Sequence, residues 1–66
     1  MEFRFILKEL RLEKGLSQIE VAKTVNMSKM AISHWEKGNS EPSIEQLKLL
    51  ARFFDVSMDY LTGFSE

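Results

Sequence analysis

The stretch QIEVAKTVNMSKMAISHW, residues 18–35, decides the fold that this sequence predicts. Its apolar residues recur at helical spacing on both sides of a break at Asn26-Met27-Ser28, which indicates two short helices joined by a tight turn. Ala22 is small enough for the two helices to approach closely. Asn26 tolerates the positive φ that the turn requires, and the hydroxyl of Ser28 can cap the second helix. Together these residues predict two helices that cross at a steep angle, with apolar contacts from Val21, Val25, Ile32 and Trp35.

Serines that open helices and glycines that end them divide the rest of the chain. Besides the pair around the turn, we expect helices at about residues 3–14, from 43 to about 54, and a short one that begins near 57. Residues 39–42 form a loop, and no stretch alternates with the period of two that a strand needs. The sequence therefore predicts a single compact all-α domain of five helices over residues 1–66. The opening residues are Ser17 with Glu20, Ser28, Ser43 with Gln46, and Ser57 with Asp59, and the stops are Gly15, Gly38 and Gly63.

Helical periodicity also predicts one core and leaves several apolar side chains outside it. Phe5 and Leu12 fall opposite the core face of the first helix, and Ile19 lies in an outward-facing first turn. Tyr60 and Phe64 lie near the C-terminal end. Single exposed apolar side chains are normal, whereas a group of them can form a self-association surface, so both interpretations stay open. The expected core is Phe3, Leu7, Leu10, Val21, Ala22, Val25, Ile32, Trp35, Leu47, Leu50, Ala51, Phe54, Val56 and Leu61.

Composition limits the class of protein. The 66 residues include no cysteine, which excludes disulfides and thiolate metal sites and fits a reducing compartment. The N-terminal segment MEFRFILKEL is too charged for a signal peptide, and no apolar run approaches the ~20 residues of a membrane span. We therefore expect a soluble, cytoplasmic protein without a membrane segment. A single histidine, with no Gly-rich phosphate loop and no HExxH motif, argues against an enzyme, a metal site or a cofactor.

Charge is distributed unevenly along the chain. The net charge is −1, which by itself argues mildly against a nucleic-acid partner. Residues 1–40, however, contain seven Lys or Arg and five Asp or Glu, while residues 41–66 contain two and five. Electrostatic attraction depends on the local potential more than on the total charge. A basic face beside an acidic one therefore remains compatible with a polyanionic partner.

From Leu7 to Gly63 the sequence resembles the lambda-repressor/Cro-type helix-turn-helix regulators, also called the xenobiotic-response-element family. The strings that carry the resemblance are LKELRLEKGLSQIEVA, NMSKMAISHWEKG and EPSIEQLKLLARFFDVSMDYLTG. Asn26 departs from the glycine that the family usually has at the turn, but it supports the same backbone conformation. The resemblance implies a five-helix fold that binds double-stranded DNA sequence-specifically, commonly as a homodimer on a palindromic operator. It also implies a transcriptional regulator, and we expect a repressor.

The helix that begins at Ser28 corresponds to the family's recognition helix, which enters the major groove. Lys29, Met30, Ser33 and His34 point away from its apolar stripe and match the positions that the family uses for base contacts. Lysine donates to guanine, a serine hydroxyl bonds several bases, methionine suits a thymine methyl, and histidine donates or accepts. An exposed methionine beside lysine and serine is unusual on a helix face that contacts only solvent. These four residues are therefore the expected base-reading set.

Phosphate contacts are expected around this helix, and they set register and affinity rather than sequence choice. Gln18 matches a family glutamine that contacts a phosphate and supports the recognition helix; as an alternative it is an ordinary polar residue of a first turn. The loop after the recognition helix resembles the family's phosphate-contacting loop. Lys14 and Lys23 are weaker candidates, because surface lysines are common. The full expected set is Gln18, Ser28, Lys37, Asn39 and Ser40.

Arg11 and Glu36 match a family pair that forms a salt bridge between the first helix and the end of the recognition helix. We interpret this pair as structural, because it would orient the recognition helix and act on function indirectly. Removing one member of such a partly buried pair is expected to cost ~3 kcal/mol or more. Arg11 is also within the region where a phosphate contact is expected.

One alternative function stays open beside DNA binding. The acidic C-terminal half and the surplus apolar residues favour a protein-interaction or antitoxin-like module that uses the same fold for partner binding or oligomerisation. Its surface would include the candidate dimer residues Phe5, Leu12, Tyr60 and Phe64. Longer family members continue past this point into a linker and a second domain. The chain is therefore interpreted either as a small complete protein or as a DNA-binding domain with a second domain or a protein partner beyond Glu66.

Overall fold

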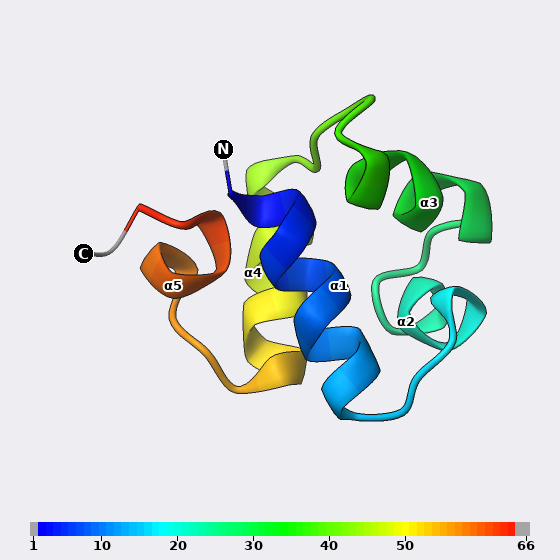
Figure 1. Cartoon of the computed structure of the whole chain (residues 1–66), viewed down its shortest axis with the longest axis horizontal. Coiled ribbons are helices and arrows are strands. Elements are labelled where there is room, and N and C mark those ends of the chain that lie inside the picture. Colours follow the sequence, from blue (N-terminus) through cyan, green and yellow to red (C-terminus); the bar gives the residue numbers. More distant parts are fainter. Residues whose placement is uncertain (1, 65–66) are drawn as a thin grey trace.

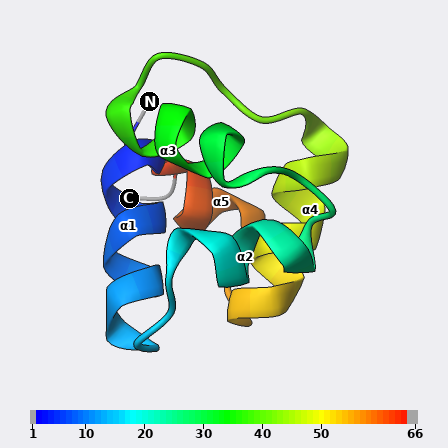
Figure 2. The same cartoon turned by 90° about the vertical axis from the view of Figure 1, so that its right-hand side faces the viewer.

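The computed structural model describes residues 2–64, and five helices account for most of them. In Figure 1, α1 lies in front of α4, with α5 on one side of it and the pair α2 and α3 on the other. Figure 2 places α1 and α4 at opposite edges, with α2 and α3 between them. The all-α architecture of five helices is as expected. Their bounds are α1 Phe3–Glu13, α2 Gln18–Thr24, α3 Lys29–Lys37, α4 Ile44–Phe54 and α5 Met58–Thr62.

Serine caps begin four of the helices, as their spacing predicted. The Ser17 hydroxyl accepts a hydrogen bond from the backbone N–H of Glu20, and the Glu20 carboxylate accepts one from Ser17 N–H, which completes a capping box. Ser43 and Gln46 form a second capping box at the start of α4. Ser57 caps α5 through the N–H of Tyr60. Each cap satisfies backbone donors that the first turn of a helix leaves without partners.

The capping box at α2 makes the start of this helix sensitive to acid. The backbone N–H of Ser17, with a further contribution from its hydroxyl, holds the pKa of Glu20 below the ordinary glutamate value. A carboxyl whose pKa is lower in the folded than in the unfolded chain stabilises the fold above its unfolded pKa, and this contribution disappears as pH falls through the folded pKa. We expect the Ser17 amide NMR signal to move as pH falls through this acidic range, and Glu20→Gln to remove that step. Identical titration curves for both proteins would contradict the assignment.

The core lies where the five helices meet, and most of the expected residues are buried in it. Leu10 and Val56 are the exceptions, because both are half-buried and pack against its edge. Ile6, Leu16, Ala31 and Met58 join them there. Within residues 2–64, every buried side-chain nitrogen or oxygen has a hydrogen-bond partner, and no helix is both long and apolar enough to cross a bilayer. The buried core residues are Phe3, Leu7, Val21, Ala22, Val25, Ile32, Trp35, Leu47, Leu50, Ala51, Phe54 and Leu61.

Candidate nucleic-acid interface

The turn between α2 and α3 has the geometry that its sequence predicted. Asn26 adopts a φ of 55°, and the backbone N–H of Met27 donates to the carbonyl of Ala22 at 2.9 Å. Ala22 is buried, so its single methyl group lets α3 pack directly on α2. The Ser28 hydroxyl accepts a hydrogen bond from Ala31 N–H at 3.2 Å and starts α3. This turn sets the position of α3 from its N-terminal end.

Apolar packing and a glycine stop hold the other end of α3. Ile32 and Trp35 are buried, and the Trp35 ring meets the edge of Phe3 with 6.3 Å between ring centroids. Gly38 ends the helix with a φ of 78°, in the left-handed region that glycine adopts without a steric cost. A Cβ at this position would also lie 2.7 Å from Nη1 of Arg4. α3 is therefore fixed at both ends, and its outer face is left to solvent.

The four expected base-reading residues lie together on that outer face. Met30 is 67% exposed, Lys29 and His34 are exposed, and Ser33 is half-buried. Lys29, Met30 and Ser33 line one shallow hollow with Ser28. The hollow thus combines a cation, a thioether and two hydroxyl groups, a mixture that suits the polar edges and methyl groups of bases.

A buried ion pair connects α1 to the end of α3. Nε of Arg11 lies 2.7 Å from Oε2 of Glu36, and Nη2 donates to Oε1 at 3.0 Å, so the pair is bidentate. Nη1 of Arg11 donates to the carbonyl of Leu16 at 2.9 Å. The two side chains are only 10% and 4% exposed. The hydrogen bonds that Arg11 donates to the Glu36 carboxylate raise the pKa of Arg11 above its ordinary value, although burial opposes this. The expected pair is therefore formed, and it also holds the loop between α1 and α2.

Gln18 joins this network through a bond that the sequence did not predict in detail. Its Nε2 donates to Oε1 of Glu36 at 3.1 Å, which ties the first residue of α2 to the C-terminal part of α3. The side-chain nitrogen carries two hydrogens, and Glu36 takes one of them. Gln18 is half-buried, so the second hydrogen remains available for a ligand at the surface. Gln18 can therefore support the recognition helix and contact a phosphate at the same time.

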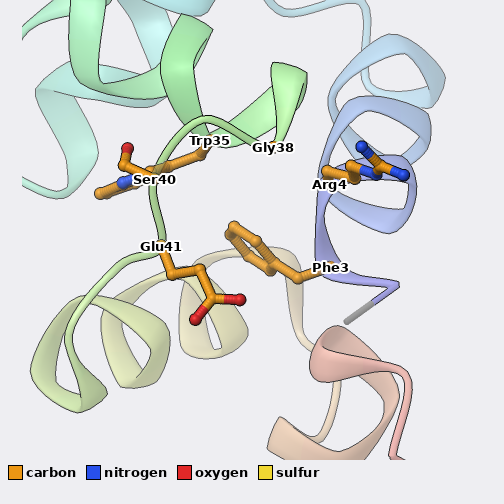
Figure 3. A pocket seen from close by; sticks show the side chains of 6 residues that line it. All are labelled: Phe3, Arg4, Trp35, Gly38, Ser40 and Glu41. Carbon is orange, nitrogen blue, oxygen red and sulfur yellow. The ribbon is translucent and has the colours of Figure 1, made fainter.

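The end of α3 and the loop that follows it present three of the expected phosphate-contact residues. Lys37, Asn39 and Ser40 are exposed, and Asn39 N–H donates to the carbonyl of His34 at 2.9 Å. Figure 3 shows the ring of Phe3 pointing from α1 toward the part of this loop that carries Ser40 and Glu41. The lining of this pocket is Phe3, Arg4, Trp35, Gly38, Ser40 and Glu41. Because a guanidinium and a carboxylate both border it, the pocket itself is poorly suited to bind an anion.

The remaining candidates lie on other surfaces. Lys14 is the C-cap residue of α1, and Lys23 lies in the last turn of α2; both are exposed. The candidate dimer residues divide between two elements. Phe5 and Leu12 on α1 are each 58% exposed, whereas Tyr60 on α5 and Phe64 beyond it are 46% and 83% exposed.

Two features of the surface were missed. The amide of Gln46 donates to the sulfur of Met27 at 3.1 Å, so the start of α4 touches the turn. Three apolar residues of α4, namely Ile44, Leu49 and Phe53, are exposed although the sequence analysis did not single them out. The positions of Leu49 and Phe53 opposite the core face of α4 are the signal that would have identified them, whereas Ile44 is the first residue of the helix.

Comparison with known proteins shows which family and which solved structures this chain resembles. Residues 7–61 match the family HTH_3, described as helix-turn-helix. Over 66 residues, its whole length, the chain is 41% identical to the HTH-type transcriptional activator BcrR of Enterococcus faecalis. The chain spans about a third of the length of that relative (32%).

Two solved structures resemble the chain closely. A transcriptional regulator from Listeria innocua superimposes with a TM-score of 0.92 at 31% identity, covering 97% of this chain and 60% of that one. The c2 repressor of Salmonella phage P22, solved in complex with synthetic operator 9T, superimposes with a TM-score of 0.85 at 32% identity and 89% coverage of each chain.

The chain belongs to the helix-turn-helix family of DNA-binding transcriptional regulators, of the lambda-repressor-like type. This family is non-enzymatic. The family and the fold expected from the sequence are therefore confirmed.

Proposed function

We propose that residues 1–66 act as a single DNA-binding domain that reads an operator by placing α3 in the major groove. The observation that carries the proposal is the outer face of α3, a helix fixed at both ends, on which Lys29, Met30 and His34 are exposed and Ser33 is half-buried. A rigid element that presents such a mixed set of donors, acceptors and apolar groups suits direct reading of base edges. The P22 c2 repressor, which has this fold, was solved on its operator.

Phosphate contacts would come from the residues that surround α3. Gln18 and Ser28 lie at the starts of α2 and α3, while Lys37 is the last residue of α3 and Asn39 and Ser40 lie in the loop that follows. Contacts on both sides of the recognition helix would fix its register along the duplex. Because the chain carries a net charge of −1, the affinity is expected to be modest and strongly salt-dependent.

We further propose that two copies bind a palindromic operator and repress transcription. Two recognition helices would occupy successive major grooves about 34 Å apart. Support for repression comes from the P22 c2 repressor, which this chain matches over 89% of each chain. BcrR is an activator; the chain covers 32% of BcrR and 26% of the full-length P22 c2 repressor, so coverage does not favour either direction of regulation. A promoter–reporter assay with the selected operator between the promoter and the reporter distinguishes the two directions.

A selection from a random double-stranded DNA pool tests the proposal. For the wild-type chain we expect an enriched palindromic motif that survives an increase in salt. In the Lys29→Ala and His34→Ala variants, the preference should relax at the bases that each side chain touches, at a cost of roughly 1–3 kcal/mol per base. Lys37→Ala serves as the control, because loss of a phosphate contact weakens binding to all sequences alike. Uniform weakening by all three variants would contradict base reading by α3.

A protein-interaction module is the second candidate function, and the exposed apolar residues favour it. Phe5, Leu12 and Tyr60 are each 46% exposed or more, which is compatible with a partner-binding surface. Binding of the DNA pool without sequence enrichment, lost at higher salt, would indicate a weak polyanion affinity and would move this function to first place.

A further inference from the structure

The methionine side chains are distributed unevenly over the fold. The chain contains four methionines and no cysteine, so thioethers are its only sulfur groups. Within residues 2–64, Met58 is half-buried and packs against the edge of the core, whereas Met27 and Met30 are 36% and 67% exposed. Met27 lies in the turn before α3, and Met30 lies in the first turn of α3. The most accessible thioethers of the described residues therefore lie at the start of the recognition helix.

A hydrogen bond distinguishes the two exposed thioethers. Sδ of Met27 accepts a hydrogen bond from Nε2 of Gln46 at 3.1 Å, which engages a sulfur lone pair. Gln46 is itself held in place, because its Oε1 accepts a hydrogen bond from Ser43 N–H at 2.7 Å in the capping box of α4. An oxidant reacts with a lone pair of the thioether sulfur. Met30, which has the larger exposed fraction, is therefore expected to react faster than Met27.

We propose that Met30 is an oxidation-sensitive residue, and that its conversion to the sulfoxide by a hydroperoxide weakens base reading by α3. The inference rests on the proposed function, because Met30 belongs to the expected base-reading set. In the reaction, the sulfur attacks one oxygen of hydrogen peroxide, so that an S–O bond forms and the O–O bond breaks. The proton of the attacked oxygen passes to the leaving hydroxide, which departs as water. The thioether is oxidised by two electrons, and the peroxide is reduced.

The surroundings of Met30 favour this reaction. Met30 lines its hollow together with Ser28, Lys29 and Ser33, so an ammonium group and two hydroxyl groups border the thioether. These groups can donate hydrogen bonds to the leaving hydroxide and then to the new sulfoxide oxygen. An ammonium group that bonds the sulfoxide oxygen is no longer free to donate to guanine, so the product also affects Lys29.

Oxidation changes the chemistry that α3 presents to a base. The thioether of Met30 is apolar and suits a thymine methyl, whereas the sulfoxide is a polar hydrogen-bond acceptor. Placing this acceptor against a methyl group removes its water without replacing the hydrogen bond, which is unfavourable. In the free protein the same group faces solvent, because Met30 is 67% exposed. Oxidation is therefore expected to weaken DNA binding and to leave the fold intact.

The order in which the methionines are oxidised is the first test. Peptide mass spectrometry during exposure of the 66-residue chain to hydrogen peroxide measures the rate at each position. We expect Met30 to gain an oxygen first, Met27 to follow several-fold more slowly, and Met58 to react last. Gln46→Glu keeps an oxygen for the capping box but removes the donor to Met27, so it should raise the rate at Met27. Oxidation of Met27 or Met58 before Met30 would overturn the proposal.

The effect on DNA is the second test, with the motif enriched by the selection as the probe. Oxidation of Met30 should raise the dissociation constant about tenfold, because each of two bound copies loses a methyl-sized apolar contact. The melting temperature should hardly change. Treatment with methionine sulfoxide reductases and a thiol reductant should restore the affinity, because these enzymes reduce the sulfoxide to the thioether.

Three leucine variants identify the residue responsible. Met30→Leu has its own starting affinity, and peroxide should not change that value. Met27→Leu and Met58→Leu are matched controls, because each removes a thioether elsewhere and should lose affinity on oxidation as the wild type does. Oxidised wild-type protein that binds as tightly as untreated protein would overturn the proposal, as would an equal loss in Met30→Leu. Both results leave the enriched motif, and with it the proposed function, in place. A selection that enriches no motif would instead contradict base reading itself.

Discussion

Replacing Glu36 with alanine is expected to lower the free energy of unfolding by about 3 kcal/mol or more. The change removes both acceptors of the Arg11 guanidinium, which is 10% exposed and would keep only its bond to the Leu16 carbonyl. A buried cation without a counter-charge is among the costliest defects in a small domain. Urea unfolding followed by the fluorescence of Trp35, the only tryptophan, measures the effect.

Two controls separate burial from charge. Lys48→Ala breaks the Glu45–Lys48 pair, in which Nζ and Oε1 are 3.9 Å apart and the side chains are 58% and 85% exposed, and it should change stability by less than about 1 kcal/mol. An Arg11→Met/Glu36→Met double variant should recover much of the stability, because apolar replacement of a buried pair is often neutral. Equal losses from Glu36→Ala and Lys48→Ala would contradict the special role of the buried pair.

Trp35→Ala is expected to have the largest effect, about 3–5 kcal/mol, from the lost burial and the cavity that remains. The indole is 3% exposed and packs against the ring of Phe3 in a T-shaped arrangement, so its removal leaves a cavity in the core. The free energy of unfolding of a domain of this size is only a few kcal/mol, so the variant should be largely unfolded. Circular dichroism during thermal unfolding tests this, because the fluorescent probe is gone.

Met30→Ala on the same helix is the matched control. Met30 is 67% exposed and should leave the melting temperature nearly unchanged while altering DNA binding. A large loss of stability in Met30→Ala, or a stable Trp35→Ala variant, would contradict the assignment of the two faces of α3.

The sequence predicted most of this fold because its local signals agree with one another. Ser17, Ser28 and Ser43 open helices, and the apolar periods between these caps all face one core. Asn26 was predicted to be left-handed because the turn requires a positive φ, which asparagine tolerates. Consistency of caps, turns and periodicity is what makes such a prediction succeed.

Features that depend on tertiary contacts could not be predicted from local sequence patterns. Asp55 adopts a φ of 56° at the end of α4. The sequence predicts that the helix ends near this residue, but it does not predict this left-handed conformation. The bond from Gln18 to Glu36 joins residues 18 positions apart, and only the packing of α2 on α3 brings them together. Half-burial of Leu10 and Val56 likewise depends on how far neighbouring helices extend over them.

The candidate site was predicted as a set of residues on one helix face, and the structure places those residues at the surface around α3. Which base or phosphate each side chain contacts stays a prediction, because it depends on the docked duplex. The candidate dimer residues were also recognised as exposed, but periodicity alone could not choose between α1 and the region around α5.

The bidentate bond between Arg11 and Glu36 has a consequence for the angular setting of α3. Apolar packing is non-directional, so Ile32 and Trp35 alone would permit the helix to roll by several degrees about its own axis. Two parallel N–H···O bonds to one carboxylate, with a third bond from Gln18, permit far less rotation. Because a helix has ~3.6 residues per turn, its successive side chains point about 100° apart. Rotation of α3 about its own axis would therefore change the direction in which each outward side chain points. These three hydrogen bonds therefore fix the rotation of α3 about its axis and determine which of its side chains form the outer face.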